Sequence, residues 1–202
     1  MRLSLQPHNN PSRRMDTGTD ATRYIGVVLA GGLSSRMGRD KAMLPWQGRP
    51  LIERQIAVLR EAGVETVHVS GERADYRGVA DPVAHAGPLG GIAGIAAMCD
   101  DGELLVIPVD MPRLHSTLLQ RLLVAPAAGC VHFAGHILPM RLRLDGTCRA
   151  VLAELMSAAD DRSRSLRALQ ERVGVLELPL GETDAGQLID CNTEETWREV
   201  TG

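Results

Sequence analysis

A short, almost wholly apolar run that ends in glycines constrains the fold of this chain most. Residues 25–29 read IGVVL and are followed almost at once by Gly31 and Gly32. A strand that is apolar on both faces is typical of a parallel sheet with helices on its two sides, whereas a half-exposed strand would alternate. The run therefore predicts an α/β protein whose first strand leads into a tight turn.

The remaining sequence continues this alternation of strand and helix. An amphipathic helix is predicted at 51–61, because Ile52, Ile56 and Leu59 share one face and Gly63 provides a stop. In the first half, strands are also predicted at 66–70 and 104–108, with helices at 90–98 and around Leu114–Leu122. The second half is expected to extend the sheet, with strands at 129–133, 137–142 and 173–178 and helices at 149–156 and 165–171. Together they predict a three-layer domain with a predominantly parallel sheet and some later antiparallel strands.

Length, charge and composition set the organisation of the chain. At 202 residues the chain suits one domain, and we expect a disordered tail at 1–23 followed by a folded domain at 24–202. The tail has no apolar run for a signal peptide, and no window resembles a membrane span. A net charge of −3 and only five aromatic residues argue against nucleic-acid binding. Four widely spaced cysteines without CxxC spacing suggest reduced thiols in a cytoplasmic protein.

The segment after the first strand carries the clearest chemical signal. Residues 29–41 read LAGGLSSRMGRDK, with three glycines within ten residues and the cations Arg36 and Lys41. Glycines allow backbone N–H groups to converge on an anion, and the two cations add fixed positive charge. The segment matches neither the P-loop nor the dinucleotide-binding motif. It is a candidate triphosphate site, although a glycine-rich turn with solvated charges would explain the same residues.

The same thirteen residues resemble the consensus LAGGxSxRMGxDK of the molybdenum cofactor guanylyltransferases. Three further segments resemble the family in the same order: GPLGGI at 87–92, Asp110 at the end of LLVIPVD, and DCNTEE at 190–195. The resemblance implies a Rossmann-like nucleotidyltransferase fold. It also implies transfer of GMP from GTP to molybdopterin, with release of pyrophosphate and formation of molybdopterin guanine dinucleotide.

Nucleotidyl transfer brings anions together, so it calls for cationic groups and a divalent metal. We expect Arg36, Lys41 and Asp110 to be catalytic. Asp110 is the candidate ligand for Mg²⁺, which prefers one or two carboxylates together with phosphate oxygens. Lys41 would hold the β- and γ-phosphates, and Arg36 would neutralise the leaving pyrophosphate. Asp110 could instead cap the helix that follows it.

The resemblance also implies two sets of binding residues. On the nucleotide side, backbone groups of the first turn would contact the guanine, and Asp81 would accept from the base N–H groups or bind the ribose. The full nucleotide set is Leu29, Ala30, Gly31, Gly32, Lys41, Ser70, Asp81, Gly87 and Asp110. The cofactor side comprises Pro139, Asp190 and Asn192.

Three positions depart from the family pattern, and they keep alternatives open. Ser70 and Asp190 stand where asparagine is usual, and Glu194 stands where proline is usual. Gly31, rather than alanine, is the feature associated with guanine. A relative that uses CTP or another phosphorylated acceptor is one alternative, and a catalytically idle nucleotide-binding or cofactor-delivery protein is another. Transient contact with proteins that supply the molybdenum cofactor is also expected.

Overall fold

A six-stranded sheet forms the centre of the computed structural model, which describes residues 22–31, 39–83, 86–158 and 164–201. Only β7 runs antiparallel to its two neighbours, β5 and β6; the other neighbouring pairs are parallel. This confirms the predicted α/β class with a mostly parallel sheet. In spatial order the strands are β4 (Thr66–Ser70), β1 (Tyr24–Leu29), β5 (Gly102–Pro108), β7 (Met140–Leu144), β6 (Cys130–Phe133) and β8 (Val175–Leu178).

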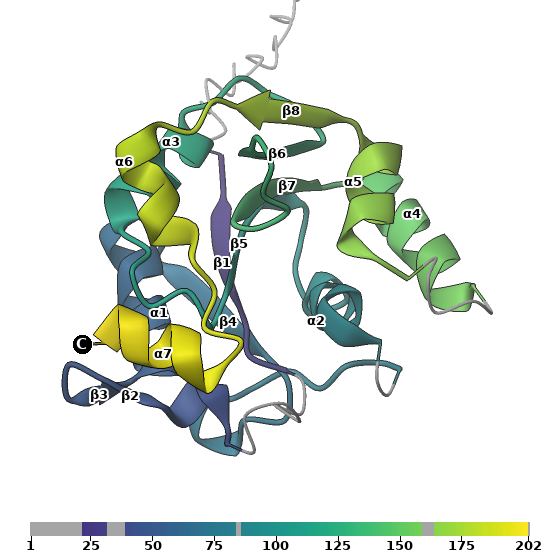
Figure 1. The fold of residues 1–202 in the computed structure, drawn as a ribbon. Coiled ribbons are helices and arrows are strands. Elements are labelled where there is room, and N and C mark those ends of the chain that lie inside the picture. The colour runs from purple at the N-terminus through teal and green to yellow at the C-terminus, as the bar shows by residue number, and fades with distance from the viewer. Residues whose placement is uncertain (1–21, 32–38, 84–85, 159–163, 202) are drawn as a thin grey trace, which may run out of the picture.

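Helices cover both faces of the sheet, which gives three layers (Figure 1). One face packs against α1 (Leu51–Glu61), α3 (Ser116–Leu123) and α7 (Glu194–Thr201), and the other against α2 (Gly87–Ala96), α4 (Gly146–Ser157) and α5 (Leu166–Val173). Val28 belongs to the first core, while Val27 and Leu29 belong to the second. The first strand is apolar throughout because alternate side chains fill two different cores.

Most predicted elements are present, with shifted bounds. Helix α1 matches its predicted range, and Gly63 follows it with a positive φ of 103°. Helix α2 begins earlier than predicted, at Gly87, since Pro88 suits the first turn of a helix. The strand predicted at 137–142 is wrong in its bounds. The observed strand starts at Met140, because Pro139 has no N–H to give to the ladder.

Several short elements escaped prediction. They include the hairpin of β2 (Pro45–Trp46) and β3 (Arg49–Pro50), the short helix α6 (Glu182–Ala185), α7, and the 3₁₀ turns η1 (Lys41–Met43), η2 (Ala74–Tyr76) and η3 (Gly186–Leu188). The rings of Trp46 and Trp197 meet edge to face at 6.2 Å between centroids. This contact joins the hairpin, which follows Lys41, to α7, which follows Asn192.

Nearly all of the predicted N-terminal tail lies outside the described residues, as do Gly32 and Arg36. Within the described ranges, no helix combines the length and the apolar character that a bilayer span requires.

Candidate active site

A cavity of about 220 Å³ lies at the carboxyl ends of β1, β4 and β5. Open α/β sheets bind ligands at this edge, where loops from neighbouring strands diverge. We call it the active-site cavity. Seven of the nine residues predicted to bind the nucleotide line it, namely Leu29, Ala30, Gly31, Lys41, Ser70, Gly87 and Asp110. The structure thus brings together segments that lie up to 81 positions apart in the sequence, from Leu29 to Asp110.

Close backbone contact at the ends of β1 and β4 shapes this cavity. A Cβ atom on Gly71 would lie 2.8 Å from the Cα of Gly31, and Gly71 has a positive φ of 96°. Both observations require glycine at position 71. A Cβ on Gly31, in contrast, would meet its nearest atom at an ordinary 3.5 Å. The glycine that distinguishes LAGG from LAAG is therefore not required by the packing of the described protein atoms.

The first turn of α2 borders the same cavity. Gly87 and Pro88 line it, and Gly87 has a positive φ of 63°. The helix is held close to the sheet, because a Cβ on Gly91 would lie 2.7 Å from the buried hydroxyl of Ser70. The first N–H groups of a helix have no partner within the helix, and the helix dipole adds partial positive charge there. This end of α2 therefore suits a phosphate group.

Lys41 lies between two oxygen-bearing side chains from distant parts of the chain. Its Nζ is 3.2 Å from Asp110 Oδ2, and it also donates to Asn192 Oδ1. The Lys41 and Asp110 side chains are only 15% and 19% exposed. The backbone N–H of Cys191 donates to the Asp110 carbonyl at 2.8 Å, which fixes the segment before α7 against the loop after β5. The sequence assigned Asn192 to the cofactor side, and the structure places it directly beside Lys41.

Arg73 is a site residue that sequence reasoning missed. It follows β4, lines the active-site cavity and donates to the Ala30 carbonyl at 3.0 and 3.3 Å. It also donates to both carboxylate oxygens of Asp40, one of them at 2.8 Å. We call these three residues the Arg73 clamp. The hydrogen bonds and positive charge of Arg73 hold the pKa of the Asp40 carboxyl below its usual range, although partial burial opposes this.

The Arg73 clamp joins residue 30 to residue 40, which lie next to the two ends of the motif segment 29–41. The only sequence signal for it was an arginine three positions after the end of a predicted strand. Such an arginine is usually solvated, so the signal was too weak to use.

Asp81, predicted to bind the nucleotide, does not line the active-site cavity and lies against α2 instead. Its carboxylate is 3.1 Å from where a Cβ on Gly90 would be, so glycine at position 90 makes room for it. Its Oδ1 is buried and has no hydrogen-bond partner among the described residues. Burial raises the pKa of this carboxyl. A buried acceptor without a partner is costly, which is consistent with a ligand group that completes it.

The remaining predicted residues lie at the edge of the site. Leu138 lines the active-site cavity, whereas the neighbouring Pro139 is buried beside it without lining it. Asp190 is exposed and does not line the cavity. The structure therefore brings Asn192, but not Asp190, to Lys41 and Asp110.

The donor set around Lys41 limits the kind of metal that could bind. In the part of the chain that the structure describes, no three His, Cys, Asp or Glu side chains converge as a metal site. Asp110 and Asn192 offer one carboxylate and one amide oxygen next to a cavity suited to phosphate. This set fits Mg²⁺ that arrives with a nucleotide, because Mg²⁺ takes few protein ligands and completes its shell with phosphate oxygens and water.

Comparisons with known proteins identify the family of this chain. Residues 26–174 match the profile of the MobA-like NTP transferase domain. The molybdenum cofactor guanylyltransferase of Xanthomonas euvesicatoria pv. vesicatoria is 49% identical over 178 residues, covering 88% of this chain and 94% of that protein.

Two solved structures share the fold. The molybdopterin-guanine dinucleotide biosynthesis protein A of Archaeoglobus fulgidus has a TM-score of 0.70 at 17% identity and covers 88% of this chain and 96% of its own. A Mycobacterium tuberculosis protein in complex with manganese has a TM-score of 0.59 at 21% identity, and the match covers 89% of this chain and 98% of that one. The match over residues 26–174 and the 49% identity show that this chain belongs to the MobA-like NTP transferase family.

Proposed function

We propose that this protein transfers GMP from GTP to the terminal phosphate of molybdopterin, releasing pyrophosphate and forming molybdopterin guanine dinucleotide. The arrangement of Lys41 between Asp110 and Asn192, beside the first turn of α2, carries the proposal. The proposal also draws on the guanylyltransferase relative that is 49% identical over 178 residues. The four free thiols are consistent with a reaction in the cytoplasm.

The chain's own groups would act mainly by positioning and by neutralising charge. Lys41 would bind β- and γ-phosphate oxygens, and the first turn of α2 would bind a phosphate through its N–H groups. The acceptor phosphate would attack the α-phosphate in line, and pyrophosphate would leave. Arg36, outside the described residues, is proposed to neutralise the leaving group.

A divalent cation fits the same site. Asp110 and Asn192 would hold Mg²⁺, which would reduce the repulsion between the phosphates when bound. Lys41 already neutralises Asp110 in the structure, so the arriving nucleotide would have to share the lysine with the carboxylate.

The base would be held without an aromatic side chain, since none of the described residues that line the active-site cavity is aromatic. Backbone groups of Leu29–Gly31 would contact the guanine, and Asp81 would accept from its N1–H and amino group. Oδ1 of Asp81 has no partner among the described residues but is enclosed by the protein, so this role would require the side chain to turn toward the active-site cavity when the nucleotide binds. Cytosine offers no equivalent pair of donors.

Pyrophosphate release measured with molybdopterin, Mg²⁺ and either GTP or CTP tests the proposal. GTP should be the better substrate, and Asp110→Ala should abolish turnover. Preference for CTP would overturn the choice of base. Nucleotide binding without transfer in the wild type would indicate an idle nucleotide-binding protein instead. Gly31→Ala, which the protein packing tolerates, tests whether this glycine sets the preference for guanine.

A further inference from the structure

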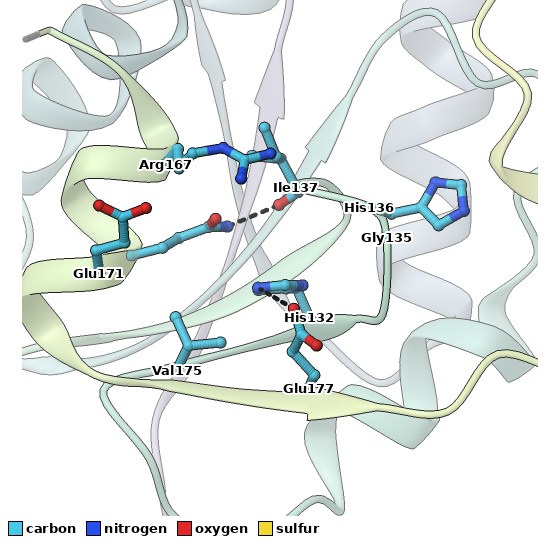
Figure 2. Close-up of a pocket in the computed structure, with 9 residues that line it drawn as sticks. His132, Gly135, His136, Ile137, Arg167, Glu171, Val175 and Glu177 are labelled. Atoms are coloured by element: carbon cyan, nitrogen blue, oxygen red, sulfur yellow. Dashed lines mark hydrogen bonds and ion pairs between the residues drawn. The ribbon is translucent and has the colours of Figure 1, made fainter.

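A second cavity, of about 300 Å³, lies between α5, β8 and the connection 134–139 (Figure 2). Polar side chains dominate its lining: His132, His136, Arg167, Gln170, Glu171 and Glu177. The mechanism proposed above uses none of them.

The second cavity lies beside the carboxyl end of β6, at the edge of the sheet that also carries the active-site cavity. Strands β5 and β6 both run antiparallel to β7, so they run parallel to each other and end at one edge. One connection contributes to both cavities, because Leu138 lines the active-site cavity and residues 135–137 line the second. Since β7 alone separates β5 from β6, the two strand ends lie about two strand spacings, or about 10 Å, apart.

Two buried polar side chains are held in fixed orientations here. His132 is 7% exposed, and its Nδ1 lies 3.0 Å from the Phe133 carbonyl, so Nδ1 carries the proton and Nε2 faces Glu177 at 3.9 Å. Gln170 is 3% exposed and donates from Nε2 to the Ile137 carbonyl at 2.9 Å. Orienting and burying polar groups beside a cavity costs free energy, which binding of a polar ligand would offset.

Charged groups complete the lining from two directions. Arg167 and Glu171 extend from α5, with Arg167 reaching toward Ile137, and Glu177 extends from β8 (Figure 2). One arginine beside two glutamates disfavours a polyphosphate. Carboxylates accept from ring N–H and amino groups, while arginine donates to a ring carbonyl. The lining therefore suits a neutral nitrogen heterocycle that carries both N–H donors and a ring carbonyl.

We propose that the second cavity binds the ring end of the acceptor, a fused nitrogen heterocycle of the pterin class, while the acceptor's phosphate lies in the active-site cavity. The inference rests on the proposed function for the identity of the acceptor. The separation of about 10 Å between the two strand ends requires an extended acceptor whose ring and phosphate are far apart. Specificity for the acceptor then depends on residues of α5 and β8, away from the nucleotide.

Substitution of the exposed lining residues tests the proposal without disturbing the core. Arg167→Ala and Glu177→Gln each remove one group that would contact the ring. Arg172→Ala is the matched control, since Arg172 is also on α5 but pairs with Glu154 at 3.0 Å and does not line the cavity. Each variant is compared with the wild type for KM with molybdopterin, for KM with GTP, and for quenching of the intrinsic fluorescence of free pterin.

Loss of a charge-assisted hydrogen bond predicts a rise of about tenfold in the KM for molybdopterin in both lining variants. The KM for GTP should stay unchanged, and the control should match the wild type. An unchanged KM for molybdopterin, or a parallel rise in the KM for GTP, would overturn the assignment.

Pterin quenching separates this inference from the proposed function, because it needs neither GTP nor turnover. Quenching that is lost in Arg167→Ala and kept in Arg172→Ala would support the cavity even if the wild type transferred no GMP. Quenching that is absent in the wild type, or equal in every variant, would refute the cavity while leaving guanylyl transfer intact.

Discussion

Removal of the Arg73 side chain should impair catalysis far more than stability. Arg73→Ala deletes the hydrogen bonds to the Ala30 carbonyl and the paired contacts to the Asp40 carboxylate. Charge-assisted hydrogen bonds contribute about 1.5–3 kcal/mol each. The Arg73 and Asp40 side chains are 19% and 40% exposed, so solvent screening reduces the ion-pair contribution. A net loss of about 2 kcal/mol in positioning would lower kcat/KM for GTP about thirtyfold.

Steady-state pyrophosphate release at varied GTP, with urea unfolding of the same variants, measures both effects. Arg73→Lys keeps the charge but cannot donate in the same fork to two partners, so it should recover only part of the activity. Asp40→Asn should lower kcat/KM by itself. Combined with Arg73→Ala it should lower kcat/KM little further, because both substitutions break the same clamp. A kcat/KM within about twofold of the wild type in Arg73→Ala would refute the positioning role.

Three further predictions concern packing, the base contact and the thiols. Gly91→Ala should lower the free energy of unfolding, measured by urea titration, by about 1–3 kcal/mol, because its Cβ would lie 2.7 Å from the buried Ser70 hydroxyl. Gly146→Ala is the control and should have little effect, because a Cβ there meets no described atom within 4 Å. Because burial raises the pKa of Asp81, GTP affinity should weaken with falling pH sooner than an ordinary aspartate would allow, and calorimetry should find this acid limb absent in Asp81→Asn. Burial raises the pKa of Cys130 and Cys148 to about 12, so iodoacetamide at pH 8 should modify them in urea but not in the native protein; fast native labelling would contradict the buried placement.

The elements that could be predicted are those whose signal is local. The run at 25–29 predicted β1 because its apolar, β-branched residues leave no polar face. The spacing of Ile52, Ile56 and Leu59 predicted α1 within its observed bounds. Both α6 and α7 were missed, although Trp197 and Val200 of α7 lie three positions apart and are buried on one face of that helix.

The motif at 29–41 located the site but not its organisation. Seven of nine predicted nucleotide residues line one cavity, because parallel strands bring their carboxyl ends to one edge of the sheet. The contact of Lys41 with Asn192 spans 151 positions and depends on how α7 docks through Trp197 against Trp46. No local sequence pattern encodes a contact between residues so far apart along the chain.

Arg141 shows the same limit within the core. An arginine in an MRLRL strand would ordinarily face water, yet Arg141 is 4% exposed and donates to the carbonyls of Leu122, Leu123, Ala125 and Pro126. Its Nε also lies 3.4 Å from Glu103 on the neighbouring strand.

The sequence by itself determined the order of the main strands and helices, the layered class and the residues of the candidate phosphate-binding segment, because each depends on side chains that are neighbours along the chain. Only the tertiary structure decided which charges are buried together, which strand reverses, and that Arg73 and Asn192 meet the motif. Those outcomes depend on pairings across the sheet, whose free energy arises only after the distant segments are packed.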